Sequence, residues 1–248
     1  MKTAASMSRA IVFCLLVGVL PAIAQQDTRM IKARTLCYQR VANGAANAKD
    51  IFIESREDKK KIILPIENFS GQFACKLLNN EAIFFHEDGV DAKGKPKRKI
   101  VARSKVPASV KKAVFYFTPA KGKNKLLYNV RVMDDGLRKF PMGNTRLLNL
   151  HTEEVGFKLG GDAKIIKAKS LSQMGIPRGR DNFNMATVVC RMKNKKGQWQ
   201  TISENRLRFT KAKRILIVSF VNSTTKQPEL RIYRDLPARP DPLAPRGQ

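Results

Sequence analysis

Short runs of apolar and β-branched residues, separated by turn residues, follow one another along most of the chain. Between residues 114 and 159 four such runs alternate with turns, at 114–117, 126–133, 146–150 and 155–159. The gaps hold residues that favour turns, among them Asp134-Asp135-Gly136 and the stretch 140–144. Runs this short, with turn chemistry at each gap, indicate an antiparallel sheet.

Similar runs precede and follow this stretch, at 35–43, 51–53, 62–64, 73–78, 81–85, 188–191 and 215–218. Helical periodicity is weak, and only residues 107–113 and 171–174 are candidate helical turns. Many short strands spaced about ten residues apart predict an all-β sandwich fold.

The order of the runs repeats in the second half of the chain. Arg40-x-x-Asn43 recurs as Arg146-x-x-Asn149, the run 114–117 resembles 215–218, and the run around Cys75 resembles that around Cys190. Most such pairs lie 100 to 106 residues apart, but the two cysteines lie 115 apart. This repetition predicts two tandem β-sandwich domains, at residues 30–136 and 137–237. A single larger sandwich is the alternative.

The N-terminus reads as an export signal in residues 1–24. Lys2 and Arg9 precede a short apolar run, and Ala22-Ile23-Ala24 has the small residues of a cleavage site. The apolar run is about half the length that a membrane span needs. We therefore expect a periplasmic or secreted protein with no transmembrane segment in the mature chain. The Pro- and Arg-rich residues 238–248 predict a disordered tail.

The second half also carries a recognisable motif. Phe140-Pro-x-Gly143, followed by Arg146-x-x-Asn149 and a Val-x-Phe strand at 155–157, resembles uncharacterised bacterial exported β-sandwich modules. These modules are assigned immunoglobulin-like folds and have no known function. The resemblance implies two immunoglobulin-like domains and an envelope or extracellular location, and it carries no catalytic residues. Two such basic, exported domains are also similar in outline to periplasmic pilus chaperones, although the anchoring motifs of those chaperones are not found in order.

The net charge is far from ordinary. The chain carries +28 at pH 7, of which the export signal contributes only Lys2 and Arg9. Such a charge opposes compaction and favours an anionic partner, and it exceeds what solubility requires. Both halves are basic, so the charge does not reside in a tail.

Catalytic and metal-binding constellations are not apparent. The only histidines, His86 and His151, each precede turn-like residues, so we expect surface histidines without a ligand role. No G-x-S-x-G nucleophile motif occurs. Trp199, the only tryptophan, is more typical of a core or hairpin aromatic than of a ligand platform. We expect no enzyme and no cofactor, although a pair of carboxylates distant in sequence would escape this reasoning.

Three cysteines remain after removal of the signal: Cys37, Cys75 and Cys190. We expect Cys190 to be a free, buried thiol, because it lies in the other predicted domain. Cys37 with Cys75 is the one plausible disulfide, and three buried thiols are the alternative.

Basic clusters in predicted loops are the strongest chemical feature. The predicted polyanion-binding residues are Lys93, Lys95, Lys97, Arg98, Lys99, Lys121, Lys123 and Lys125. Side chains of this kind neutralise phosphate, sulfate or uronate groups and release counterions. The expected function is a non-enzymatic module that binds an anionic polysaccharide or another envelope polyanion. Export makes nucleic acid a poor candidate. The alternative is a scaffold or chaperone-like subunit that binds a protein partner through exposed sheet edges.

Overall fold

The structure is a computed structural model that describes residues 27–41, 50–55, 58–120, 126–194, 196–222 and 225–236. All regular structure among these residues is β, which confirms the predicted all-β fold. Within them no helix is long and apolar enough to cross a membrane. The predicted export signal and the C-terminal tail lie outside the described residues.

The first half of the chain forms eight strands. They are β1 (Thr28–Cys37), β2 (Ile51–Ser55), β3 (Asp58–Ile62), β4 (Phe73–Leu78), β5 (Glu81–Val90), β6 (Pro96–Lys105), β7 (Lys112–Pro119) and β8 (Tyr128–Asp134). They pair in the order β3-β2-β5-β4-β1-β7-β8, with β6 on the other side of β5. β4 and β5 pair only at Leu78 and Glu81, so this sheet consists of two four-stranded layers that meet at one corner.

The second half forms eight further strands. They are β9 (Thr145–Asn149), β10 (Val155–Leu159), β11 (Asp162–Ile166), β12 (Leu171–Met174), β13 (Met185–Lys193), β14 (Trp199–Arg208), β15 (Arg214–Val221) and β16 (Pro228–Asp235). They form two separate sheets, in the orders β11-β10-β13-β14 and β12-β9-β15-β16. The prediction of a helical turn at 171–174 is wrong, because these residues pair with β9 as β12.

The two halves follow one pairing scheme. β1 pairs parallel with β7 and antiparallel with β4, and β9 pairs in the same way with β15 and β12. The layers β3-β2-β5-β6 and β11-β10-β13-β14 also correspond strand for strand. Both halves carry a register shift at the same place, between Phe84 and Phe85 and between Cys190 and Arg191. A β-bulge is a specific feature of a fold, so this match extends the likeness beyond strand order.

The strand pairing changes the residue matches expected from the sequence. Cys190 lies on β13, whose counterpart is β5, so its equivalent is Phe84 at a distance of 106 residues (190 minus 84). Cys75 lies on β4, whose counterpart is β12. The two cysteines are therefore not at equivalent positions, which explains their separation of 115 residues. The equivalent of Arg146 is Arg34 on β1, not Arg40. Asn43 lies outside the described residues.

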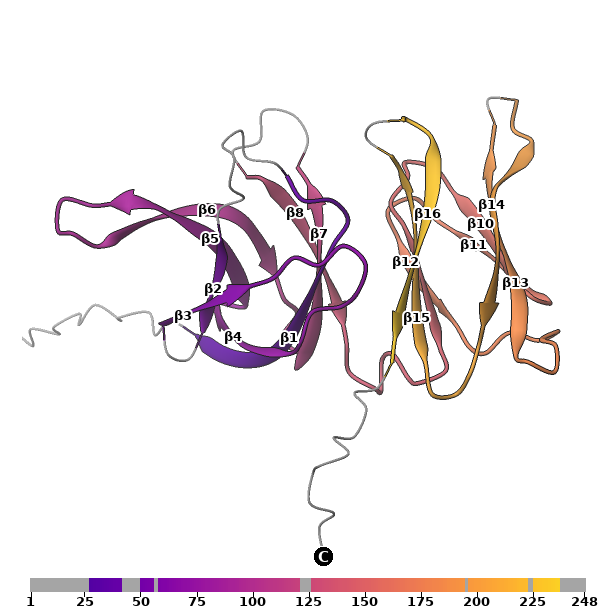
Figure 1. The fold of residues 1–248 in the computed structure, drawn as a ribbon, viewed down its shortest axis with the longest axis horizontal. Coiled ribbons are helices and arrows are strands. Elements are labelled where there is room, and N and C mark those ends of the chain that lie inside the picture. The colour runs from indigo at the N-terminus through magenta and orange to yellow at the C-terminus, as the bar shows by residue number, and fades with distance from the viewer. Residues whose placement is uncertain are drawn as a thin grey trace, which may run out of the picture.

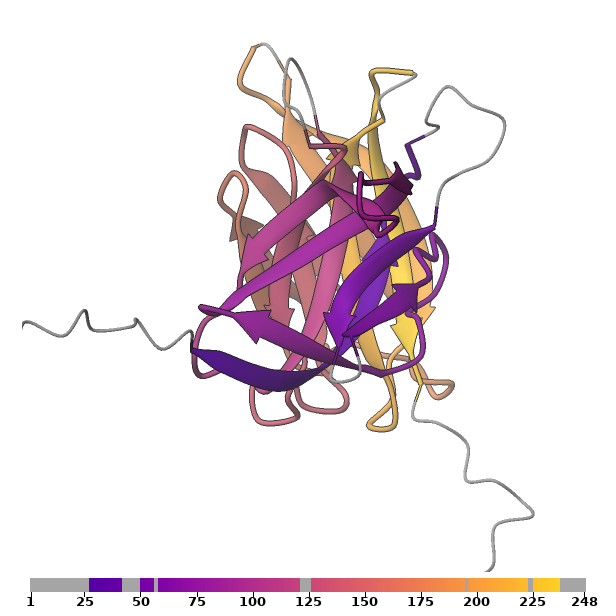
Figure 2. The ribbon, with the colours of Figure 1, turned by 90° about the vertical axis from the view of Figure 1, so that its left-hand side faces the viewer.

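The strands stack as four layers (Figure 1), and Figure 2 shows the first half in front of the second. One apolar core fills the first half and another lies between the two sheets of the second half. A third core joins the halves, because the outer faces of β1, β7 and β8 pack on those of β9, β15 and β16. Tyr116 and Tyr233 meet there with ring centroids 6.2 Å apart. The halves are thus held together by a buried apolar interface.

Candidate anion-binding site

The predicted basic segment at residues 93–99 lies at the end of the β5–β6 hairpin, which projects from the first half (Figure 1). At its turn, Asp91 Oδ1 accepts hydrogen bonds from the backbone N–H groups of Lys93 at 2.8 Å and Lys95 at 2.9 Å. The prediction of one long basic loop is wrong for residues 96–99, which belong to β6. The charges therefore lie on a two-stranded ribbon.

Four lysines on this ribbon are exposed: Lys93, Lys95, Lys97 and Lys99. Within the described residues no carboxylate forms an ion pair with any of them. The nearby Glu87 pairs with Lys59 instead. We call these four residues the hairpin lysines. They are available to an anionic ligand.

Arg98 does not belong to this set. Its guanidinium lies 2.5 Å from Glu54 and 2.8 Å from Asp58, and it stacks on the Phe85 ring at 4.6 Å from the centroid. Two carboxylates and an aromatic face already satisfy the charge, so Arg98 is a structural residue of the layer. The sequence could not show this, because the three partners come from three different strands or their ends.

The second predicted segment, Lys121, Lys123 and Lys125, lies outside the described residues. The strands that flank it, β7 and β8, do form a hairpin, with Pro119 paired to Tyr128. At the loop end of this hairpin the Leu127 N–H donates to the Val101 carbonyl on β6 at 2.9 Å. Leu127 and Lys99 therefore lie at the same end of the first half.

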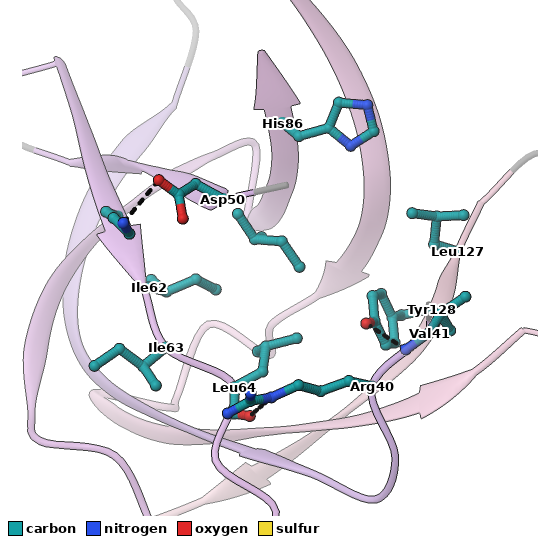
Figure 3. A pocket seen from close by; sticks show the side chains of 11 residues that line it. Arg40, Val41, Asp50, Ile62, Ile63, Leu64, His86, Leu127 and Tyr128 are labelled. Carbon is teal, nitrogen blue, oxygen red and sulfur yellow. Dashed lines mark hydrogen bonds and ion pairs between the residues drawn. The ribbon is translucent and has the colours of Figure 1, made fainter. Parts of the chain in front are cut away.

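A cavity of about 220 Å³ opens at this end, between β2, β3, β5 and β8 (Figure 3). Its floor is aliphatic, with Ile62 and Leu64 buried beneath it. Arg40 Nε donates to the Leu64 carbonyl at 2.9 Å, and Lys61 pairs with Asp50 at 2.7 Å. The rim thus has one cation, Arg40, that no described carboxylate neutralises.

His86 forms part of the cavity wall and is only 4% exposed (Figure 3). The prediction of a surface turn histidine is wrong, because β5 continues through Glu87 and Asp88. His86 is paired in register with Lys99, and directly opposed residues of an antiparallel pair point to the same face. Of the hairpin lysines, Lys99 therefore lies beside the cavity.

A second group of charged residues lies between the halves. Arg34 pairs with Asp135 at 2.9 Å and with Asp235 at 2.8 Å, and Arg214 pairs with Asp135 at 3.1 Å and also with Asp235. Burial opposes ionisation of Asp235, but hydrogen bonds from Arg34 and the charge of Arg214 hold its pKa below the ordinary value. The two positive and two negative charges balance, so this cluster joins the halves and is not an anion site. We call these four residues, Arg34, Asp135, Arg214 and Asp235, the lock.

His151 is also buried, and the prediction of a surface position is wrong for it too. It is 3% exposed, and its Nε2 lies 2.7 Å from Ser219 Oγ. Burial, with a smaller contribution from the charge of Lys169, lowers its pKa to about 4. His151 is therefore a neutral core residue at pH 7.

The three cysteines are free and buried. Cys75 pairs in register with Ile31, six residues before Cys37 on the same strand, which corresponds to roughly 20 Å along β1. The predicted Cys37–Cys75 disulfide is therefore wrong, because a disulfide needs Cα atoms within about 7 Å. Burial raises the pKa of Cys37 to about 11 and that of Cys190 to about 12.

Chemically, this end of the molecule offers cations and an apolar cavity. No three His, Cys, Asp or Glu side chains gather for a metal ion in the part of the chain that the structure describes. Exposed ammonium groups attract phosphate, sulfate or carboxylate groups without orienting them for a reaction. The hairpin lysines can therefore bind anionic groups.

No protein-family model matches the chain, and no curated protein is detectably similar to it.

Proposed function

We propose that the mature protein is an exported, non-enzymatic module that binds an anionic cell-envelope or extracellular polymer through the hairpin lysines. The observation that carries the proposal is that these four side chains are exposed and without a carboxylate partner among the described residues. Lys59 and Arg98, on the same layer, both have such partners. The hairpin therefore carries a concentrated charge that the fold does not use.

The proposed module consists of two tandem domains. The shared pairing scheme and the shared bulge support two tandem β-sandwich domains at residues 30–136 and 137–237. The proposed domains are immunoglobulin-like in having two packed sheets. Their strand order differs from that of an immunoglobulin domain. An immunoglobulin domain pairs its first and second strands in one sheet, whereas β9 and β10 lie in different sheets.

The test compares two variants of equal charge. In the first, the hairpin lysines are exchanged for Gln. In the second, the exposed residues Lys105, Lys111, Lys139 and Lys167 are exchanged for Gln. Binding to a labelled polyuronate is measured by fluorescence anisotropy across a salt series. Each released counterion contributes at most about one to the slope of log affinity against log salt.

We expect the hairpin variant to lose about two to three units of that slope, and the control variant about one or less. Equal losses in the two variants would mean that only net charge matters. The absence of binding by the unmodified protein at low salt would reject the proposal and favour the scaffold alternative, which crosslinking to a protein partner would then test.

A further inference from the structure

The outer face of the β11-β10-β13-β14 sheet presents the only tryptophan of the chain to solvent. Trp199 begins β14, opposite Lys193 on β13, and is 38% exposed. Its six-membered ring extends across β13 to β10, where a Cβ added to Gly156 would lie 3.3 Å from Cζ3. Gly156 thus leaves room for the indole on the sheet surface.

Cations surround the indole on the same face. Arg191 pairs in register with Gly156, and Lys158 follows two residues later on β10, so all three positions face outward. Both side chains are exposed, and neither forms an ion pair with the described residues. Lys193 Nζ lies 5.3 Å from the indole centroid and 4.0 Å from Glu154. The one carboxylate at an outward strand position of this sheet is Glu204, opposite Val189.

At the equivalent positions of the first half, aromatic rings are covered by a cation whose charge is neutralised by carboxylates. By register, Phe52 stands in place of Gly156, Phe85 in place of Arg191, and Arg98 in place of Trp199. There the aromatic rings lie beneath, Phe85 is 2% exposed, and Arg98 covers it while pairing with Glu54 and Asp58. In the second half the aromatic ring lies on top. Arg191 and Lys158 form no ion pair with the described residues, and only Lys193 lies near a carboxylate, at 4.0 Å from Glu154.

We propose that this outer face binds an acidic polysaccharide, one sugar ring of which stacks on Trp199 while its anionic groups pair with Arg191 and Lys158. The C–H groups of a pyranose ring carry partial positive charge and favour the negative face of an indole. Uronate or sulfate groups on the ring complement the three cations Lys158, Arg191 and Lys193. The site goes beyond the hairpin, since it lies in the other half of the molecule.

A single aromatic residue also distinguishes this ligand from single-stranded nucleic acid. Surfaces that bind such strands stack successive bases on several aromatic side chains. Trp199 is the one aromatic residue at an outward position of the four described strands of this sheet. The face therefore provides one stacking position with charged flanks, which suits a sugar chain.

The test uses the fluorescence of Trp199, which reports on this face alone. The mature protein and the hairpin-lysine variant are titrated with polygalacturonate, with neutral dextran and with poly(dT), and acrylamide quenching is measured at each point. We expect polygalacturonate to shield Trp199 from quenching in both proteins, and neutral dextran to have little effect. Shielding in the hairpin variant separates this face from the hairpin.

Three variants examine the named contacts by anisotropy of labelled polygalacturonate. We expect Trp199→Ala to weaken binding by roughly tenfold in the hairpin-lysine background, in line with the loss of other aromatic stacking partners. Arg191→Gln should weaken it severalfold while retaining the indole as a reporter, and Thr187→Ala, at an outward position of β13 farther from the indole, should not. The melting temperature of each variant is measured as a control for folding.

Unchanged quenching of Trp199 in the presence of bound polygalacturonate would overturn the proposal, as would an unaltered affinity in both Trp199→Ala and Arg191→Gln. Shielding by poly(dT) but not by polygalacturonate would overturn it in favour of a nucleic-acid surface. Failure of hairpin binding alone, with shielding of Trp199 retained, would reject the function proposed for the hairpin and leave this one standing.

Discussion

The outermost layers of the two halves are built on one scheme but treat their surfaces in opposite ways. In the first half, Phe52 and Phe85 lie under Lys59 and Arg98, and carboxylates neutralise both cations. In the second half, Trp199 lies over Gly156, and the outward-facing Arg191 and Lys158 form no ion pair with the described residues. The same strand positions thus serve stability in one half and remain available for binding in the other.

Position in a repeated fold therefore does not determine the role of a residue. Arg98 and Trp199 occupy equivalent places, but only Arg98 is held by two ion pairs. The innermost layers differ less. Arg34 and Arg146 are equivalent, and both lie close to the acidic residues between the halves. Both inner layers thus place an arginine near these acidic residues, whereas the equivalent outer positions hold an arginine in one half and a tryptophan in the other.

The largest expected effect comes from breaking the lock between the halves. Asp235→Ala leaves Arg34 and Arg214 sharing Asp135 alone, and removing one partner from a buried ion-pair network costs about 3 kcal/mol or more. We expect a corresponding fall in the free energy of unfolding, measured by urea denaturation. A loss below that of an exposed control such as Asp50→Ala would show that the lock contributes nothing.

The lock also gives an acid dependence. Because the folded pKa of Asp235 lies below its unfolded value, its contribution is present above pH 4 and is lost as pH falls through the folded pKa. We expect thermal denaturation to show a steeper loss of stability below about pH 4 in the unmodified protein than in Asp235→Asn. Parallel pH profiles would contradict the assignment.

Arg98→Gln should have a smaller effect on stability. It removes two partly exposed ion pairs and a cation–π contact, together worth about 1 kcal/mol. Trp199→Ala, at the equivalent position, should change the free energy of unfolding by less than this if its indole serves mainly the surface. Urea denaturation of both variants tests the contrast directly, and equal losses would remove it.

The titration of His151 has no effect on stability at pH 7, and its effect appears only in mild acid. Burial lowers its folded pKa to about 4, below the ordinary value of 6.5, so the unfolded chain binds the proton first. Its contribution is complete above pH 6.5 and is lost as pH falls from 6.5 to 4. We expect the melting temperature of the unmodified protein to decline over this range. His151→Gln should show a flatter profile, and an identical slope would place the titration elsewhere.

The sequence predicts where strands form better than it predicts which strands pair with one another. The apolar run at 114–117 is the centre of β7, because β-branched and aromatic residues favour buried strands wherever they pair. The four residues of β12 carry too weak a pattern, and only pairing with β9 makes them a strand. His86 was misplaced because Glu87-Asp88-Gly89 has turn composition, yet pairing with β6 continues to Val90.

The candidate sites depend on register, which explains why the sequence revealed them only in part. The hairpin lysines were visible as a basic run. Arg98 could not be separated from them, because its contacts to Glu54 and Asp58 span 44 and 40 residues of sequence. The contact of Trp199 with Gly156 crosses an intervening strand and depends on the bulge at Cys190. Neither relation has a local signal.

The stack of four sheets also fixes the valency of the molecule. Packed sheets lie about 10 Å apart, so the two outermost layers stand roughly 30 Å from one another and face away from each other. The buried interface between the halves prevents these layers from turning towards a common side. A short anionic chain therefore cannot engage the hairpin and the Trp199 face at once, and gains no chelate advantage. Two long chains could bind to one molecule, one at the hairpin and one at the Trp199 face. The protein would then be a rigid crosslink between polymer strands.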